Sequence, residues 1–482
     1  MQNVTEMALD LIPMGTEEKD WQRERGNSKE LPEGITSRQV YADIVHIAWP
    51  ALVELTLTQI ASMVDMMMIG RLGSWALAGV GLTTQPKFLL MTAFIAMNVG
   101  TTALVARYKG AGEKEKAEKV FQQAMTFTLI TSLIASVLGY LFAEKLILFM
   151  GAQDEQSLNA GVVYLRIQMA GFVFMALTTT VTAALRGVGN SKVAMIYNLA
   201  ANIVNVILNY LLIYGNLGFP RLEVAGASLA TIIGQGVAFV WAMKYVLGKK
   251  EYIYFRINKE LIPDWTVLKT IFAIGVPAMV EQLVMRTGLI IYTKTVAGLG
   301  TVPYATHQVC MNVLALSFMT GQALAVSATT LVGQSLGRKR SDMAEHYSRR
   351  SQHIGLVLAV LIAIVFAVCN EEIMMLYSSE SPIIEQGARI LLLVAVAQPF
   401  QVSQFILAGA LRGAGDTRSI AVYTFLTILI LRPALAMLLI HYTDLGLIGA
   451  WIALVLDQLV RTALVVGRYR SGKWKYIKLE SL

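Results

Sequence analysis

Two carboxylates lie inside one long apolar segment of the chain. Asp65 sits in the run Met63-Val-Asp-Met-Met-Met-Ile-Gly70, and Glu54 precedes it by 11 residues. In an α-helix this spacing returns to within roughly 20° of the same face, about 16 Å along the axis. An ionisable side chain within lipid costs about 2.5–3.5 kcal/mol on insertion scales, so it usually faces a cavity or a partner. We therefore expect Asp65 and Glu54 to take part in ion coupling.

Both acids also admit a structural interpretation. Asp65 can be a buried acid that pairs with a distant cation, or one at a frayed end of its segment. The Pro-x-x-x-Glu pattern of Pro50 and Glu54 recurs at Pro277 and Glu281, so it can equally mark a repeated structural contact. Burial in a poorly hydrated cavity disfavours a charged carboxylate, which suits a group that loads and releases a proton. This favours Asp65 as the coupling residue.

The fifth apolar segment carries side-chain amides. Asn205 and Asn209 are one helical turn apart and therefore share a face, and Thr231 lies in the next segment. Amides in lipid serve either as ligands or as hydrogen bonds between helices. From their spacing alone, both roles stay open for Asn205, Asn209 and Thr231.

The second half of the chain carries a different set of polar residues. Gln398, Gln401 and Gln404 form a polar stripe with helical spacing, and Arg432 lies in the run Leu431-Arg-Pro433. Such groups either line a cavity or bridge helices. The residues expected to line a substrate cavity are Glu281, Tyr292, Gln398, Gln401 and Arg432.

Three further charges have simpler interpretations. Asp457 and Arg461 are four residues apart, so they are expected to neutralise each other on one helix. Lys87 lies near an outer helix end and is expected to extend its amine toward the membrane surface.

The segments that must position these side chains are written twice in the sequence. Pro50 and Glu54 reappear 227 residues later as Pro277 and Glu281, and Leu185-Arg-Gly-Val-Gly-Asn-Ser-Lys reappears at an offset of 226 as Leu411-Arg-Gly-Ala-Gly-Asp-Thr-Arg. A duplicated apolar chain is typical of transporters. The duplication is asymmetric, because Tyr292 occupies the position of Asp65, and Asn205 aligns with Leu431 or Arg432 according to the offset.

The hydropathy pattern predicts an all-α integral membrane protein with twelve transmembrane helices in two pseudo-symmetric six-helix lobes. The expected spans are 45–70, 78–106, 122–143, 159–186, 193–214, 224–247, 267–295, 304–335, 353–369, 386–411, 419–441 and 447–467. Lys and Arg concentrate in alternate loops, which places both termini in the cytosol and the protein in the cell membrane. The expected units are a cytosolic leader (1–38), an N-lobe (39–247), a cytosolic linker (248–265), a C-lobe (266–468) and a cytosolic tail (469–482).

Composition argues against several other classes of protein. The chain of 482 residues is 55% hydrophobic and 15% charged, and its net charge of +8 resides in loops. That distribution indicates membrane topology rather than nucleic-acid binding. Cys310 and Cys369 form no disulfide or metal motif, and the glycine-rich segments lack the phosphate-loop pattern. We expect no cofactor, no metal and no nucleic-acid partner, and we expect an ion gradient or the substrate itself to supply the energy.

The chain resembles bacterial members of the multidrug and toxic compound extrusion family over nearly its whole length. The motifs that carry the resemblance are Trp49-Pro, Val64-Asp65, Gly70-Arg-Leu-Gly73, Gly100-Thr-Thr-Ala, Gly110-Ala-Gly112, Leu185-Arg-Gly-x-Gly-Asn, Asn205-Val-Ile-Leu-Asn209, Gly226-Ala-Ser-Leu-Ala-Thr231 and Leu411-Arg-Gly-x-Gly-Asp416. The resemblance implies two six-helix lobes around a central cavity and export of organic cations in exchange for protons or sodium. It maps the coupling acid onto Asp65, with Asn205, Asn209 and Thr231 beside it.

Two departures limit what the resemblance implies. Some members have Asp where this chain has Asn209, and others have C-lobe acids in spans 7 and 10 that are absent here. The resemblance therefore favours proton coupling through Asp65 over a C-lobe sodium site.

The sequence thus predicts a secondary antiporter that exports amphipathic organic cations by alternating access of the two lobes. Its expected partners are these small molecules and membrane lipids, and it is expected to be a monomer. The alternative within transport is a flippase or exporter for a lipid-linked or anionic metabolite, which would need a strongly cationic cavity. A membrane enzyme is not expected, because the loops are short and carry no cluster of acids or histidines.

Overall fold

The computed structural model describes residues 35–152, 154–248, 252–256, 262–443 and 445–477. Most of the expected leader, parts of the linker and the end of the tail therefore lie outside the described residues. Within these ranges every regular element is helical. The first helix, α3 (Ser37–Gly70), starts at a capping box in which Thr36 and Gln39 satisfy each other's backbone N–H groups.

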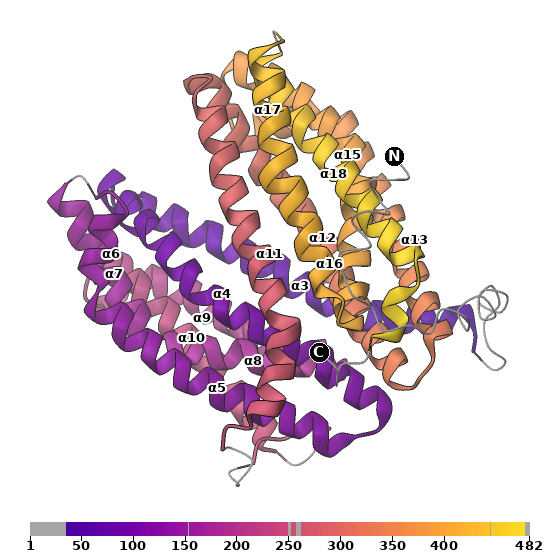
Figure 1. Ribbon diagram of the computed structural model, residues 1–482. Coiled ribbons are helices and arrows are strands. Elements are labelled where there is room, and N and C mark those ends of the chain that lie inside the picture. The colour runs from indigo at the N-terminus through magenta and orange to yellow at the C-terminus, as the bar shows by residue number, and fades with distance from the viewer. Residues whose placement is uncertain (1–34, 153, 249–251, 257–261, 444, 478–482) are drawn as a thin grey trace.

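The helices form two lobes of similar plan (Figure 1). The N-lobe contains α3, α4 (Ser74–Ala111), α5 (Lys114–Leu141), α6 (Ala143–Phe149), α7 (Glu155–Ala170), α8 (Phe172–Val188), α9 (Ser191–Tyr214) and α10 (Glu223–Leu247). The C-lobe contains α11 (Trp265–Ala297), α12 (Thr301–Gly337), α13 (Ser341–Val368), α14 (Asn370–Met375), α15 (Ser381–Ala414), α16 (Thr417–Thr424), a π-helical segment (Phe425–Leu431), α17 (Arg432–His441) and α18 (Gly446–Arg470).

Among the described residues, eleven helices are long and apolar enough to cross a membrane, and a bent pair brings the number to twelve. This confirms the predicted all-α membrane architecture. The fourth predicted span, 159–186, is not one helix, because α7 and α8 meet at an angle of 53°. Gly171 lies at this break, where an added Cβ would come within 2.4 Å of Ile232 in α10. Close packing between neighbouring helices therefore accompanies the bend.

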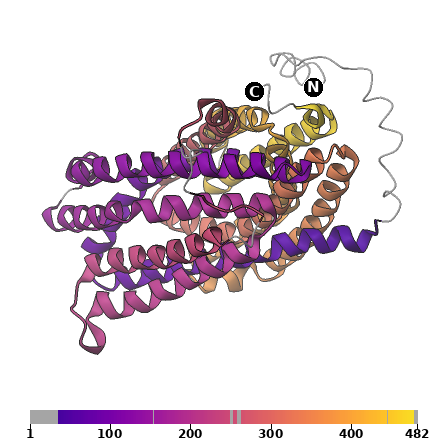
Figure 2. The same cartoon turned by 90° about the horizontal axis from the view of Figure 1, so that it is seen from below.

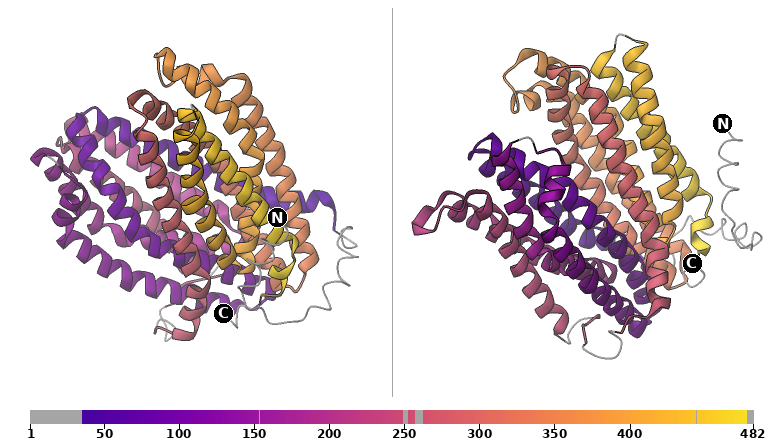
Figure 3. Two further views of the ribbon diagram at one scale, coloured as in Figure 1. Left: turned by 45° about the horizontal axis from the view of Figure 1, so that its top comes forward. Right: turned by 60° about the vertical axis from the view of Figure 1, so that its left-hand side comes forward.

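The two lobes diverge at one end and meet at the other (Figures 1 and 3). Seen from below, the N-lobe helices lie beside and partly in front of those of the C-lobe (Figure 2). At the closed end α4 and α12 cross through a pair of repeated glycines. A Cβ on Gly110 would lie 2.0 Å from the carbonyl oxygen of Gln334, and one on Gly337 would lie 2.1 Å from that of Arg107. Only glycine lets the two backbones approach this closely.

The first helix of each half crosses into the core of the other lobe. Val40 and Ile44 of α3 pack in one hydrophobic cluster with Ile406 of α15. In the same way, Leu268 and Ile271 of α11 belong to the cluster that fills the N-lobe. The lobes are therefore joined by two exchanged helix halves as well as by the linker.

Candidate functional site

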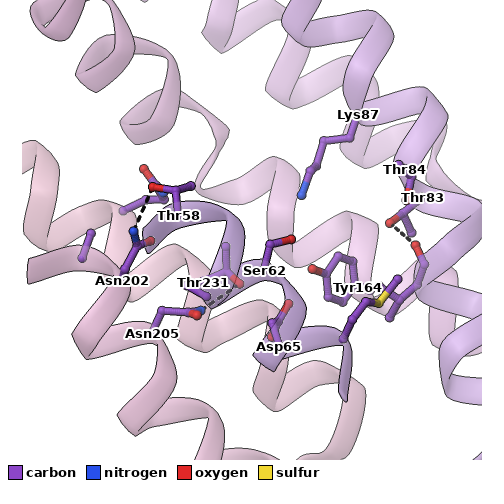
Figure 4. A pocket seen from close by; sticks show the side chains of 15 residues that line it. Thr58, Ser62, Asp65, Thr83, Thr84, Lys87, Tyr164, Asn202, Asn205 and Thr231 are labelled. Atoms are coloured by element: carbon purple, nitrogen blue, oxygen red, sulfur yellow. Dashed lines mark hydrogen bonds between the residues drawn. The ribbon is translucent and has the colours of Figure 1, made fainter. Parts of the chain in front are cut away.

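The N-lobe holds a polar cavity of about 340 Å³ between α3, α4, α7, α9 and α10. Among its lining residues Asp65 contributes the carboxylate and Lys87 the ammonium, while the rest are hydroxyls, amides and small apolar groups. Figure 4 shows Asp65, Lys87 and Tyr164 around this space. This cavity is called the N-lobe cavity below.

Asp65 belongs to a chain of hydrogen bonds that runs through α9 to α10. Asn209 Nδ2 donates to Asp65 Oδ1 at 2.7 Å and to Asn205 Oδ1 at 3.3 Å. Asn205 Nδ2 donates in turn to Thr231 Oγ1 at 3.2 Å. Four of the five residues expected in the ion-coupling set therefore lie together.

The register of α3 against α9 produces this arrangement. Three amides of α9 donate to three acceptors of α3, and each pair is separated by 144 residues in the chain: Asn198 to Glu54 (2.7 Å), Asn202 to Thr58 (3.0 Å) and Asn209 to Asp65 (2.7 Å). A constant separation means that the helices run parallel with their polar stripes facing. The two polar stripes have matching spacing in the sequence, a signal from which the contact could have been predicted.

Glu54 lies apart from the Asp65 network. Its Oε1 is 2.9 Å from Arg186 Nη2, at the wall of a second cavity of about 480 Å³. Arg412 Nη2 is 2.5 Å from Glu281 Oε1. These two ion pairs occupy equivalent positions in the repeat. In each lobe, the glutamate of the Pro-x-x-x-Glu motif pairs with the arginine of the Leu-Arg-Gly motif.

The second cavity lies between the lobes and adjoins the N-lobe cavity. Thr58, Asn202 and Gln235 line both spaces. The C-lobe contributes Thr329 and Arg412 to its wall, together with Val326. This cavity is called the interlobe cavity below.

The five residues expected to line a substrate cavity line neither of these two spaces. Glu281 pairs with Arg412, and Gln398 and Gln401 are buried within the C-lobe. Tyr292 is fully buried, and its ring centroid is 5.5 Å from that of His307. Sequence patterns predicted polar stripes here, but the packing of the C-lobe turns them inward.

Arg432 lies in a buried ion-pair cluster. Its Nε donates to Asp457 Oδ2 at 3.0 Å, its Nη2 also contacts that oxygen, and Arg461 Nη2 lies 3.4 Å away. The expected pairing of Asp457 with Arg461 is therefore incomplete, because Arg432 makes the shorter contacts. The sequence could not place Arg432 next to α18 without the packing of α17.

The π-helical segment Phe425–Leu431 explains which residue matches Asn205. A π-turn holds one residue more than the α-helical turn it replaces. The offset therefore rises from 226 before this segment to 227 after it, which aligns Asn205 with Arg432 rather than with Leu431.

Lys87 and Tyr164 are cavity residues that the sequence did not identify. The Lys87 amine was expected at the membrane surface, but it lines the N-lobe cavity, with its Nζ 5.9 Å from the Tyr164 ring centroid. The long helix α4 places Lys87 more than three turns from its start at Ser74. At the 227-residue offset Lys87 aligns with Leu314, so neither charge of the N-lobe cavity is repeated in the C-lobe.

Comparisons with known proteins agree with the duplicated architecture. The MatE family model matches the chain twice, at residues 50–211 and 277–438. The chain is 29% identical over 448 residues to the probable multidrug resistance protein NorM of Thermotoga maritima, covering 93% of this chain and 94% of that protein. It is 27% identical over 433 residues to the multidrug resistance protein MdtK of Yersinia pestis, covering 89% and 94%.

Solved structures confirm the fold. A MATE crystal structure in a bent conformation matches with a TM-score of 0.83 at 22% identity, covering 90% of this chain and 96% of that one. A multidrug resistance MATE family transporter matches with a TM-score of 0.82 at 22% identity, covering 91% and 97%. The chain belongs to the multidrug and toxic compound extrusion (MATE) family of membrane transporters.

Proposed function

We propose that this protein is a secondary antiporter that exports amphipathic organic cations in exchange for H⁺ or Na⁺. The observation that carries the proposal is Asp65, a carboxylate on the wall of a cavity inside a membrane-spanning lobe. Such a group can hold either a coupling ion or a cationic substrate, but both cations together would exceed its single charge. Competition for Asp65 would then link export to the ion gradient.

The arrangement of the lobes supports alternating access. The closed end, around Gly110 and Gly337, adjoins loops rich in Lys and Arg, which by the positive-inside rule face the cytosol. On this assignment the termini are cytosolic, the interlobe cavity opens outward, and the protein is a multi-pass protein of the cell membrane. Rocking of the lobes about the glycine crossing would expose the cavity to the other side.

We favour H⁺ as the coupling ion, because Asp65 can bind a proton by itself. Asp65 accepts from Asn209, and the neutral groups of Asn205 and Thr231 lie in the same network. Protonation of Asp65 needs no additional ligands, whereas Na⁺ usually requires several oxygens. We therefore propose proton exchange at Asp65, without a further cofactor and in a monomer.

Export of a lipid-linked or anionic metabolite is the weaker alternative. Arg186 and Arg412 line the interlobe cavity, which by itself would suit an anion. Each guanidinium is held by a glutamate, however, with N–O distances of 2.9 Å for Glu54–Arg186 and 2.5 Å for Glu281–Arg412. The resulting charge of the wall is close to neutral, which favours amphipathic substrates.

The test is efflux of a fluorescent lipophilic cation from proteoliposomes under an imposed pH or Na⁺ gradient. We expect the pH gradient to drive efflux and Asp65→Asn to abolish it. Asp154→Asn is the matched control, because Asp154 only caps α7 by accepting from the Ser157 N–H at 2.7 Å and Asn caps helices equally well. Full gradient-driven efflux by Asp65→Asn would overturn the proposal.

A further inference from the structure

The N-lobe cavity contains a cation of its own opposite the coupling acid. Lys87 lies on α4 and Asp65 on α3, and both side chains line the same space (Figure 4). The Lys87 amine makes no hydrogen bond or salt bridge with any residue that the structure describes, and its ring contact with Tyr164 is long, at 5.9 Å. It is thus available to an anionic group inside the cavity.

The remaining walls supply no counter-charge for Lys87. Tyr164 of α7 contributes a phenol, and α9 and α10 contribute the amides of Asn202 and Asn205 and the hydroxyl of Thr231. Asp65 is the one carboxylate of the lining; it accepts a hydrogen bond from the neutral amide of Asn209 at 2.7 Å and forms no salt bridge with Lys87, so it is the only opposite charge in this cavity. A simple monovalent cation bound at Asp65 would therefore share a small cavity with an unneutralised ammonium.

We propose that Lys87 forms an anion subsite, so that the N-lobe cavity selects molecules bearing both a cationic and an anionic group. The cationic group pairs with Asp65 and the anionic group, a carboxylate or a similar acid, pairs with Lys87. Binding of such a molecule then leaves the net charge within the cavity unchanged. A volume of about 340 Å³ suits a compact molecule of this kind.

The repeat supports a shared role for the two charges. At the equivalent C-lobe positions Asp65 is replaced by Tyr292 and Lys87 by Leu314, both of which are buried. The lobe that lacks the acid also lacks the amine. This inference rests on the proposed export of charged small molecules and adds to it the chemical class that the cavity prefers.

The experiment compares the binding of two dyes to the purified protein in lipid nanodiscs, measured by fluorescence polarisation. One is a rhodamine methyl ester, which is a cation, and the other is the same rhodamine as its free acid, which is a zwitterion. We expect Lys87→Gln to weaken binding of the free acid about tenfold or more, since it removes a charge-assisted contact. Binding of the ester should stay unchanged or tighten, and Lys87→Arg should restore the preference of the wild type.

Lys145→Gln is the matched control, because Lys145 is an exposed residue of α6 outside the cavity. Equal changes for both dyes in Lys87→Gln, including loss of both, would overturn the anion subsite, and so would an unchanged preference. The cationic ester distinguishes a failure of the anion subsite from a failure of the proposed function. If wild-type protein exports the ester along a gradient while Lys87→Gln leaves the preference unchanged, only the subsite is wrong. If wild-type protein binds neither dye, the proposed function fails as well.

Discussion

The N-lobe and the C-lobe repeat one helical plan but hold their charges in opposite ways. In the N-lobe, Asp65 and Lys87 face a cavity, and Asp65 has one amide as its hydrogen-bond partner. In the C-lobe, Asp457 is buried between Arg432 and Arg461. A charge that faces a cavity can exchange partners, whereas a charge held by two guanidiniums stabilises its own lobe. We therefore propose that the N-lobe binds the transported ions and substrates, while the buried charges of the C-lobe stabilise the fold.

Residues at equivalent positions of the two lobes account for this difference in how the charges are held. Asn205 donates to Thr231 in the N-lobe, and its counterpart Arg432 reaches Asp457 in the C-lobe. Tyr292 stands in place of Asp65 and lies beneath Arg432, whose guanidinium is 5.7 Å from the Tyr292 ring centroid. A large ring and an ion pair occupy the C-lobe equivalent of the N-lobe network.

The largest expected loss of stability comes from breaking the C-lobe cluster. Asp457→Asn leaves the guanidiniums of Arg432 and Arg461 without their counter-charge, which should lower the free energy of unfolding by about 3–5 kcal/mol. The measurement is the melting temperature in detergent, with Asp65→Asn as the matched substitution in the N-lobe. Asp65→Asn should lower stability by no more than about 1 kcal/mol. Equal losses in the two variants would contradict the division between a supporting and a binding lobe.

A smaller and symmetric effect is expected where the lobes are alike. Glu54→Gln and Glu281→Gln each remove the charge that holds one arginine, Arg186 or Arg412. Since both arginines are partly exposed, each loss should be about 2 kcal/mol. Thermal unfolding of the two variants side by side measures this. A loss confined to one of them would show that the repeated ion pairs have different roles.

The glycine crossing should be sensitive to a single methyl group. Gly110→Ala places a Cβ against the backbone of α12, and Gly337→Ala places one against that of α4. Each should lower stability by about 1–2 kcal/mol and loosen the closed end of the lobes. Gly81→Ala is the control on the same helix α4, because no atom lies within 4 Å of its added Cβ. If all three variants have the same melting temperature, the glycine crossing does not limit how closely the lobes approach.

The smallest effect is expected at Tyr292, the C-lobe counterpart of Asp65. Its buried hydroxyl has no hydrogen-bond partner among the described residues. Tyr292→Phe keeps the ring packing against His307 and removes an unsatisfied polar group, so stability should stay the same or rise by up to about 1 kcal/mol. A marked loss of stability or of transport would give the hydroxyl a role that this comparison denies it.

The sequence predicted the architecture well because duplication and apolar length are strong signals. The helical spans and the two lobes follow from patterns within single segments and from the repeat. The grouping of Asn205, Asn209 and Thr231 near Asp65 was implied by the resemblance to a known family. The α3–α9 contact is visible as two polar stripes with the same spacing.

The partners of the other charges depend on packing that no local pattern records. Glu54 meets Arg186 at the end of a different helix, and Arg432 reaches Asp457 only after the π-helical segment Phe425–Leu431 shifts the register. Lys87 was assigned to the membrane surface because its position in the apolar run suggested a helix end. The continuation of α4 around it places it instead on the cavity wall.

The most direct test of an N-lobe coupling site is gradient-driven dye efflux from proteoliposomes containing one of two variants. The first is Asp65→Asn, and the second is the triple substitution Arg432→Met, Asp457→Leu and Arg461→Met, which replaces the whole C-lobe ion-pair cluster by apolar side chains. We expect the first variant to lose the dependence of efflux on the imposed ion gradient and the second to keep it. Coupled efflux that survives in Asp65→Asn but disappears in the C-lobe variant would contradict the account.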